Sequence, residues 1–144
     1  MLSFSLIVSP EFVDLVREVS TPGPEGGNHW IDLALRIPQW GWLQDWAAYP
    51  DSNYIPHAFS LEFEHCHHPL LTEREWTVGC APENHHGSIQ YFVENVLPVI
   101  AEQIDWCYTL DRRNPLPTEW NLADGKMVCN QRPLIAHPDS GFHF

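Results

Sequence analysis

The stretch LSFSLIVSPEFVDLVREV, residues 2–19, decides the start of the fold, because it predicts a strand that leads directly into a helix. Apolar residues occupy every even position from 2 to 8, the period of two expected of a half-buried strand. Ser9 can cap the free amides of a following helix, and Pro10 suits its first position. The chain therefore begins as a mixed α and β protein.

The expected helix after Ser9 is amphipathic. Its apolar stripe consists of Phe12, Val13, Val16 and Val19. Its outer face is acidic, with Glu11, Asp14 and Glu18 at near-helical spacing. We expect the stripe to pack on the sheet and the carboxylates to face water.

Three further strands are predicted from alternation. Residues 30–37 place isoleucine and leucine at positions 31, 33, 35 and 37, until Pro38 ends the pattern. A third strand, His57–His65, turns Phe59, Leu61 and Phe63 inward. Its expected hairpin partner, Arg74–Cys80, turns Trp76 and Val78 toward the same core.

The second half of the chain predicts one long helix and one edge strand. Apolar residues at 89, 92, 93, 96, 100 and 104 indicate a helix over 88–104, with a kink at Pro98. A last strand over 127–136 contains Pro133, which favours an edge position. The expected architecture is an α+β single domain over 1–144, with a mostly antiparallel sheet of four to five strands and two main helices on one face. A ferredoxin-like arrangement with an inserted hairpin is one compatible topology.

The net negative charge of the chain excludes several classes of binding partner and favours one. The chain of 144 residues has 19 acidic against 7 basic residues, a net charge of −12, and Lys126 is its only lysine. Such a surface repels phosphate backbones and anionic lipids, so nucleic acid and membranes are poor partners, whereas basic proteins are attracted. With neither a leader-like segment nor an apolar span, we expect a cytoplasmic protein.

A cluster of histidines and cysteines is the alternative functional signal. Imidazole and thiolate are the usual zinc ligands, and the candidates are His65, His67, Cys80 and His85. The spacing matches no zinc-binding pattern, so a merely histidine-rich hairpin end competes with this interpretation. The four cysteines contain no C-x-x-C pair, and we expect them to be reduced; a single disulfide between two of them is the alternative, because pairing depends on distances that the sequence does not give.

Three tryptophans crowd into residues 38–50. If this segment is helical, Trp42 and Trp46 lie one turn apart beside Asp45, and Trp40 precedes them. Aromatic rings beside a carboxylate are typical of an interface for a basic partner. A second small core and a carbohydrate-stacking platform are the competing interpretations.

Carboxylates also gather on the expected hairpin. Glu62 and Glu64 face outward on one strand, with Glu73 and Glu75 on or beside its partner. Like charges on adjacent strands repel each other, so they weaken a sheet unless a partner or an ion neutralises them. These four residues, together with the tryptophan segment, are the predicted partner-binding residues.

The expected function is that of a small acidic protein that inhibits or masks a basic protein, such as an immunity protein that neutralises a bacterial toxin or a mimic of nucleic acid. No catalytic motif such as H-E-x-x-H, G-x-S-x-G or a P-loop is present, so the sequence favours a non-enzymatic role without a cofactor. The alternative is a metal-binding domain, or a metal-dependent enzyme, built on the histidine cluster between His65 and His86.

Overall fold

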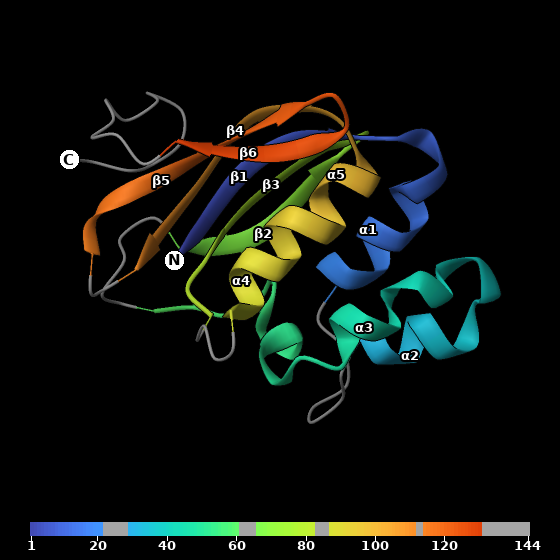
Figure 1. Ribbon diagram of the computed structural model, residues 1–144. Coiled ribbons are helices and arrows are strands. Elements are labelled where there is room, and N and C mark those ends of the chain that lie inside the picture. The colour runs from blue at the N-terminus through green and yellow to red at the C-terminus, as the bar shows by residue number, and fades with distance from the viewer. Residues whose placement is uncertain (22–28, 61–65, 83–86, 112–113, 131–144) are drawn as a thin grey trace.

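The fold is α+β, and the helices of the described residues lie on one side of an antiparallel sheet (Figure 1). A computed structural model of the chain describes residues 1–21, 29–60, 66–82, 87–111 and 114–130. The sheet has six strands in the order β2-β3-β1-β4-β5-β6. The predicted fold class is confirmed, although the sheet is larger than the four to five strands expected.

Strand β1, Leu2–Val8, is confirmed at its predicted bounds and lies inside the sheet, between β3 and β4. Its even-numbered residues are fully buried on the face that the helices cover. Ser3 and Ser5, on the opposite face, are buried as well, and Ser5 Oγ lies 3.2 Å from Thr77 Oγ1. The strand is therefore covered on both faces rather than on one.

The first helix also forms as predicted. A short 3₁₀ turn, η1 (Pro10–Phe12), leads into α1 (Val13–Ser20), and the three acidic residues of its outer face are exposed. Leu15 joins Val16 and Val19 in the buried stripe. The Ser9 side chain does not cap the helix; instead, its backbone N–H donates to Ile100 O at 2.8 Å.

The predicted strand over residues 30–37 is wrong, because the chain forms a helix there. Helix α2 spans His29–Arg36 and buries Trp30, Leu33 and Ala34. These positions follow the helical spacing i, i+3, i+4, whereas Leu35, which alternation placed inward, is 71% exposed. An Asp32–Arg36 ion pair at 3.2 Å, one turn apart, is consistent with the helix.

The segments after α2 are short helical turns: η2 (Pro38–Leu43), α3 (Gln44–Ala47) and η3 (Pro50–Tyr54). They join α2 in a small helical layer beside α1 (Figure 1). A buried hydrogen bond of 2.8 Å from Trp30 Nε1 to Ile55 O ties α2 to the chain beyond η3. The tryptophan segment is thus helical, which was the condition for the expected placement of Trp42 and Trp46.

Of the two strands predicted for the hairpin, the second, Arg74–Cys80, is confirmed with small changes in its bounds, and the first, His57–His65, is wrong. Strand β3 (Glu75–Cys80) buries Trp76 and Val78 as expected, but it pairs with β2 (His67–Thr72) rather than with 57–65. Residues 58–60 have no regular secondary structure, and Phe59, expected to point inward, is exposed; residues 61–65 lie outside the described part of the chain.

The long helix forms in three segments: α4 (Ser88–Tyr91), the π turn η5 (Phe92–Val96) and α5 (Leu97–Ile100). Leu97 N–H donates to Phe92 O, five residues back, so the helix widens just before Pro98. Pro98 then lies in the first turn of α5, where its missing N–H costs little. The expected interruption at Pro98 therefore takes the form of a π turn.

The helix ends at Ile100 rather than at 104, because strand β4 (Ala101–Asp111) begins there. Two bulges relative to β1 leave Glu102 and Asp105 without an opposite residue. As a result, Ala101, Ile104 and Cys107 lie opposite Val8, Leu6 and Phe4, residues of β1 whose side chains point into the core. Ile104 therefore faces the core four residues after Ile100, which imitates a helical period and explains the misprediction.

Two more strands complete the sheet. Strand β5 (Asn114–Ala123), which we did not predict, pairs with β4, and β6 (Lys126–Asn130) forms the edge that was expected near 127–136. Residues 131–136 lie outside the described part. The first four strands follow the β-α-β-β-α-β element order of a ferredoxin-like arrangement, and the additional hairpin follows them instead of being inserted.

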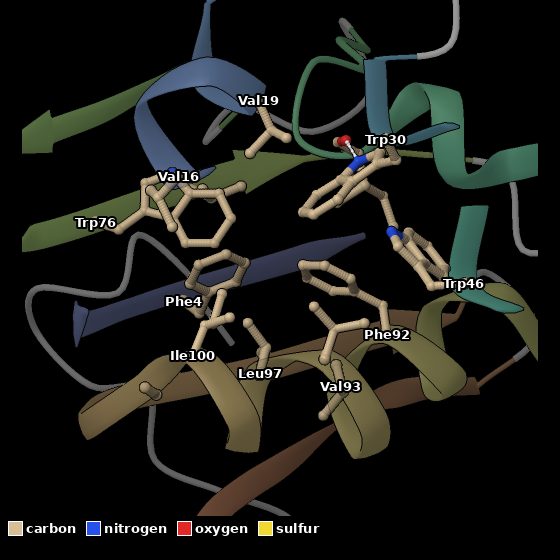
Figure 2. Close-up of a cluster of buried hydrophobic side chains, with 14 of the residues drawn as sticks. Phe4, Val16, Val19, Trp30, Trp46, Trp76, Phe92, Val93, Leu97 and Ile100 are labelled. Atoms are coloured by element: carbon tan, nitrogen blue, oxygen red, sulfur yellow. Dashed lines mark hydrogen bonds between the residues drawn. The ribbon is translucent and has the colours of Figure 1, made fainter. Parts of the chain in front are cut away.

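The core lies between the sheet and the helices, and aromatic rings fill its centre. In Figure 2, Phe4 of β1 faces Trp76 and Phe92, with ring centroids 5.0 and 6.3 Å apart. Phe92 also contacts Trp30 and Trp46, which joins the helical layer to the sheet. In the part of the chain that the structure describes, no helix is both long and apolar enough to cross a bilayer.

Candidate functional site

Two tyrosines and a carboxylate meet at the outer margin of the aromatic core, and we call Asp45, Tyr49 and Tyr91 the tyrosine rim. The Tyr49 and Tyr91 rings lie 4.7 Å apart, and each is half-buried. Beneath them, the fully buried Trp46 lies parallel to Tyr91, at 7° and 6.3 Å. Asp45, next to Trp46 in α3, is exposed. The rim thus offers ring surface and negative charge together.

Buried hydrogen bonds fix the segments that carry the rim. Ser88 Oγ donates to Asp51 Oδ2 at 3.1 Å, and both side chains are buried. Asp51 follows Tyr49 by two residues and Ser88 precedes Tyr91 by three, so this bond joins η3 to α4 within three residues of each ring along the chain. Ser52 Oγ also donates to Ala47 O at 3.1 Å, which holds η3 against α3. The rim is therefore set on a rigid support.

The electrostatic environment of the rim is negative. Burial raises the pKa of Tyr91 above its ordinary value, and the nearby charges of Asp45 and Tyr49 raise it further. The charge of Asp45 thus disfavours ionisation of the Tyr91 hydroxyl. A cation placed on the rim would be stabilised by the same field.

The three predicted tryptophans divide between core and surface. Trp40 and Trp46 are buried, and Trp46 packs against Trp30 and Phe92, so neither side chain is open to a partner. Trp42 is 38% exposed and contacts Phe12 of η1 edge-on at 6.0 Å. Trp42 and Trp46 therefore do not share one face as expected; the 3₁₀ geometry before Gln44 turns them apart.

The structure describes two of the four carboxylates that were predicted to bind a partner from the hairpin, Glu73 and Glu75. Glu62 and Glu64 lie outside the described residues. Glu73 sits in the turn between β2 and β3, and Glu75 lies opposite Thr72 on one side and Ile7 on the other. Both are exposed, but neither faces a carboxylate across these pairs. Arg74, between them, forms its ion pair with Glu102 of β4.

The predicted metal ligands are not brought together where the structure describes them. His65 and His85 lie outside the described residues. His67 is exposed and lies opposite Gly79, so its side chain and that of the fully buried Cys80 are on different faces of the sheet. Burial raises the pKa of the Cys80 thiol, which disfavours the thiolate that metals bind. Across the described ranges, no group of three or more His, Cys, Asp or Glu side chains could hold a metal ion.

Tyr91 is a residue of the candidate site that the sequence analysis missed. It lies on the flank of the helical stripe, between Ile89 and Phe92, so periodicity alone does not place it in the core. A tyrosine beside an apolar stripe is a usable signal, because its ring can pack while its hydroxyl stays wet. Its pairing with Tyr49, 42 positions earlier, depends on the tertiary fold.

Comparison of the chain with models of known protein families, with curated proteins and with solved structures finds no match. The functional argument therefore depends on the site itself.

Proposed function

We propose that this protein is an acidic binding protein that masks a basic protein partner, in the manner of an immunity protein bound to a toxin or of a mimic of nucleic acid. The observation that supports this best is the tyrosine rim, where Asp45 lies beside two partly open rings. Arginine and lysine side chains bind favourably both to aromatic faces and to carboxylates. We propose a cytoplasmic, non-enzymatic role that needs no cofactor.

The overall charge supports the same proposal through a different physical effect. A net charge of −12 attracts a positively charged protein over roughly a Debye length, about 8 Å at physiological ionic strength, and so raises the rate of encounter. The rim supplies short-range contacts, which determine the rate of dissociation. Exposed Trp42, next to α3, adds an apolar anchor of the kind that dominates binding energy.

The test begins with retention of partners on the immobilised protein at low ionic strength and their release by salt. A partner identified in this way is then purified and titrated calorimetrically against wild type and variants. We expect Asp45→Asn and Tyr91→Ala each to raise Kd by about tenfold or more. If the partner has a measurable activity, wild type should inhibit it stoichiometrically.

Asp124→Asn is the matched control. Asp124 is exposed in the turn between β5 and β6, and its substitution removes the same single charge as Asp45→Asn. Asparagine tolerates the positive φ of 52° at this position, so the turn is preserved. We expect Kd to stay within about twofold of wild type. If wild type, Asp45→Asn and Tyr91→Ala bind the partner with equal affinity, the tyrosine rim is not the binding site. If the immobilised protein retains no basic protein, the proposed function is wrong.

A further inference from the structure

A pair of cysteines lies at the open end of the β2–β3 hairpin, apart from the tyrosine rim. His67 of β2 lies opposite Gly79 of β3, and this register continued by one residue places Cys66 opposite Cys80. Residues directly opposite each other in an antiparallel pair project to the same face of the sheet. Cys80 pairs on its other side with Leu2, whose side chain is fully buried, so the shared face is the core face.

Burial and electrostatics agree with this placement. Cys66 is 9% exposed and Cys80 is not exposed at all, as expected for two side chains on the covered face. Burial raises the pKa of Cys80, and the neighbouring Cys66 contributes to the rise. Opposite residues have Cα atoms about 4.5–5.5 Å apart, inside the range of about 4.4–6.8 Å that disulfides span.

We infer that Cys66 and Cys80 form a reversible cross-strand disulfide when the protein meets a small-molecule disulfide such as oxidised glutathione. Cys66, which retains some exposure, attacks one sulfur of the oxidant and releases one molecule of glutathione. The Cys80 sulfur then attacks the Cys66 sulfur of this mixed disulfide and releases the second. Each protein thiol gives up one proton, and their two electrons reduce the oxidant to two thiols.

The disulfide would lock the edge of the sheet. It joins β2 to β3 at the end opposite the Glu73–Arg74 turn, so the hairpin becomes a closed ring. Closing a loop of about 15 residues restricts the unfolded chain, and for a protein of this size it should raise Tm by roughly 6–12 °C. The reduced and oxidised forms would therefore differ in stability, with the same fold.

The experiment uses a protein in which the other two cysteines are replaced, Cys107→Ala/Cys129→Ala, kept native throughout. Trypsin cuts after Arg36, Arg74 and Arg112, so peptides 37–74 and 75–112 each contain one remaining cysteine. After treatment with oxidised glutathione, we expect these peptides to be joined, the intact protein to lose two hydrogen atoms, and Tm to rise. Dithiothreitol should reverse all three changes.

Cys66→Ala in the same background is the control and should show neither the joined peptides nor the rise in Tm. If the Cys66→Ala variant does not fold, the test is kept by peptide mapping of oxidised wild type with trypsin and chymotrypsin together, because cleavage after Tyr91 or Phe92 separates Cys80 from Cys107. The inference is overturned if native protein gives only mixed disulfides with glutathione, or if wild type links Cys66 or Cys80 to Cys107 or Cys129. Neither result depends on a binding partner, so the proposed function is tested separately.

Discussion

Phe92 and Tyr91 are neighbours in the chain, yet they belong to two regions that differ in how far their aromatic rings are buried. Phe92 is fully buried in the central core, where its ring contacts Phe4, Trp30 and Trp46 (Figure 2). Tyr91, one residue earlier, belongs to the tyrosine rim and contacts Tyr49 and Trp46 from the outside. Both regions are built from aromatic rings in contact, edge-to-face or tilted in the core and parallel between Trp46 and Tyr91 in the rim, and they share Trp46.

The difference lies in what the rings leave open. In the central core each ring face is covered by another side chain, so the aromatic surface contributes to stability only. In the tyrosine rim the rings are half-buried beside an exposed carboxylate, so part of their surface is available for a ligand. Residues of the core should therefore change folding free energy, and residues of the rim should change binding.

The strongest test of this comparison is a pair of alanine substitutions at adjacent positions. Phe92→Ala opens a cavity in the core and should lower the free energy of unfolding by about 3–5 kcal/mol. Tyr91→Ala should cost less than about 2 kcal/mol, because part of its ring already contacts water. Urea denaturation of both variants measures the difference. Equal losses would show that the rim is part of the core.

A smaller effect separates two tryptophans inside the core. Trp30 Nε1 donates to Ile55 O, whereas within the described chain Trp76 Nε1 is buried without a hydrogen-bond partner. Both substitutions to phenylalanine remove the same atoms, but only Trp30→Phe leaves a carbonyl unpaired. We expect Trp30→Phe to cost about 1–2 kcal/mol more than Trp76→Phe in urea denaturation. A larger loss for Trp76→Phe would contradict the assigned bond.

The smallest effect concerns the rim at alkaline pH. Because the folded-state pKa of Tyr91 is raised, the unfolded chain ionises this tyrosine first as pH increases. Stability should therefore fall as pH rises above about 10, through the folded-state pKa. Tyr91→Phe should remove this part of the fall, and Asp45→Asn should reduce it, in urea midpoints measured from about pH 9 to about pH 11. Identical pH profiles for wild type and Tyr91→Phe would contradict the raised pKa.

The sequence alone predicted an element correctly where the local hydrophobic pattern matched the face that the fold covers. The alternation of residues 2–8 and the Pro10 start of the first helix predict β1 and α1 at nearly their observed bounds. Trp76 and Val78 are correctly placed in the core because β3 has one covered face. In these elements the apolar residues follow a single period, that of the backbone, and mark the face that packs on the core.

Prediction failed where two periods fitted the same residues. Residues 30–37 satisfy both a strand period at 31, 33 and 35 and a helical one at 30, 33 and 34, and burial follows the second. Strand β4 shows the opposite error, in which a strand residue fits a helical period. Its bulges bring Ile104 to the core face four residues after Ile100, so the helical pattern continues into the strand. Strand β5 contains Pro115 and Pro117, which argue against a strand by propensity, although its pairing with β4 and β6 forms.

The candidate site was predictable in part only. Asp45 and the aromatic character of residues 38–50 were visible in the sequence, but which rings reach the surface was not, because Trp46 and Tyr49 differ in burial within one turn. The partnership of Tyr49 with Tyr91 results from a long-range contact supported by Asp51 and Ser88. No local pattern contains that information.

The two bulges of β4 have a consequence for how this chain can vary in length. If Glu102 and Asp105 were both deleted, every other residue of β4 that pairs with β1 would keep its partner, because no residue of β1 lies opposite either of the two. What would change is curvature, because bulges add local twist to a strand. The β5–β6 hairpin, which passes over α5 in Figure 1, would then follow a flatter path. These two residues therefore set the shape of the sheet while adding nothing to its pairing.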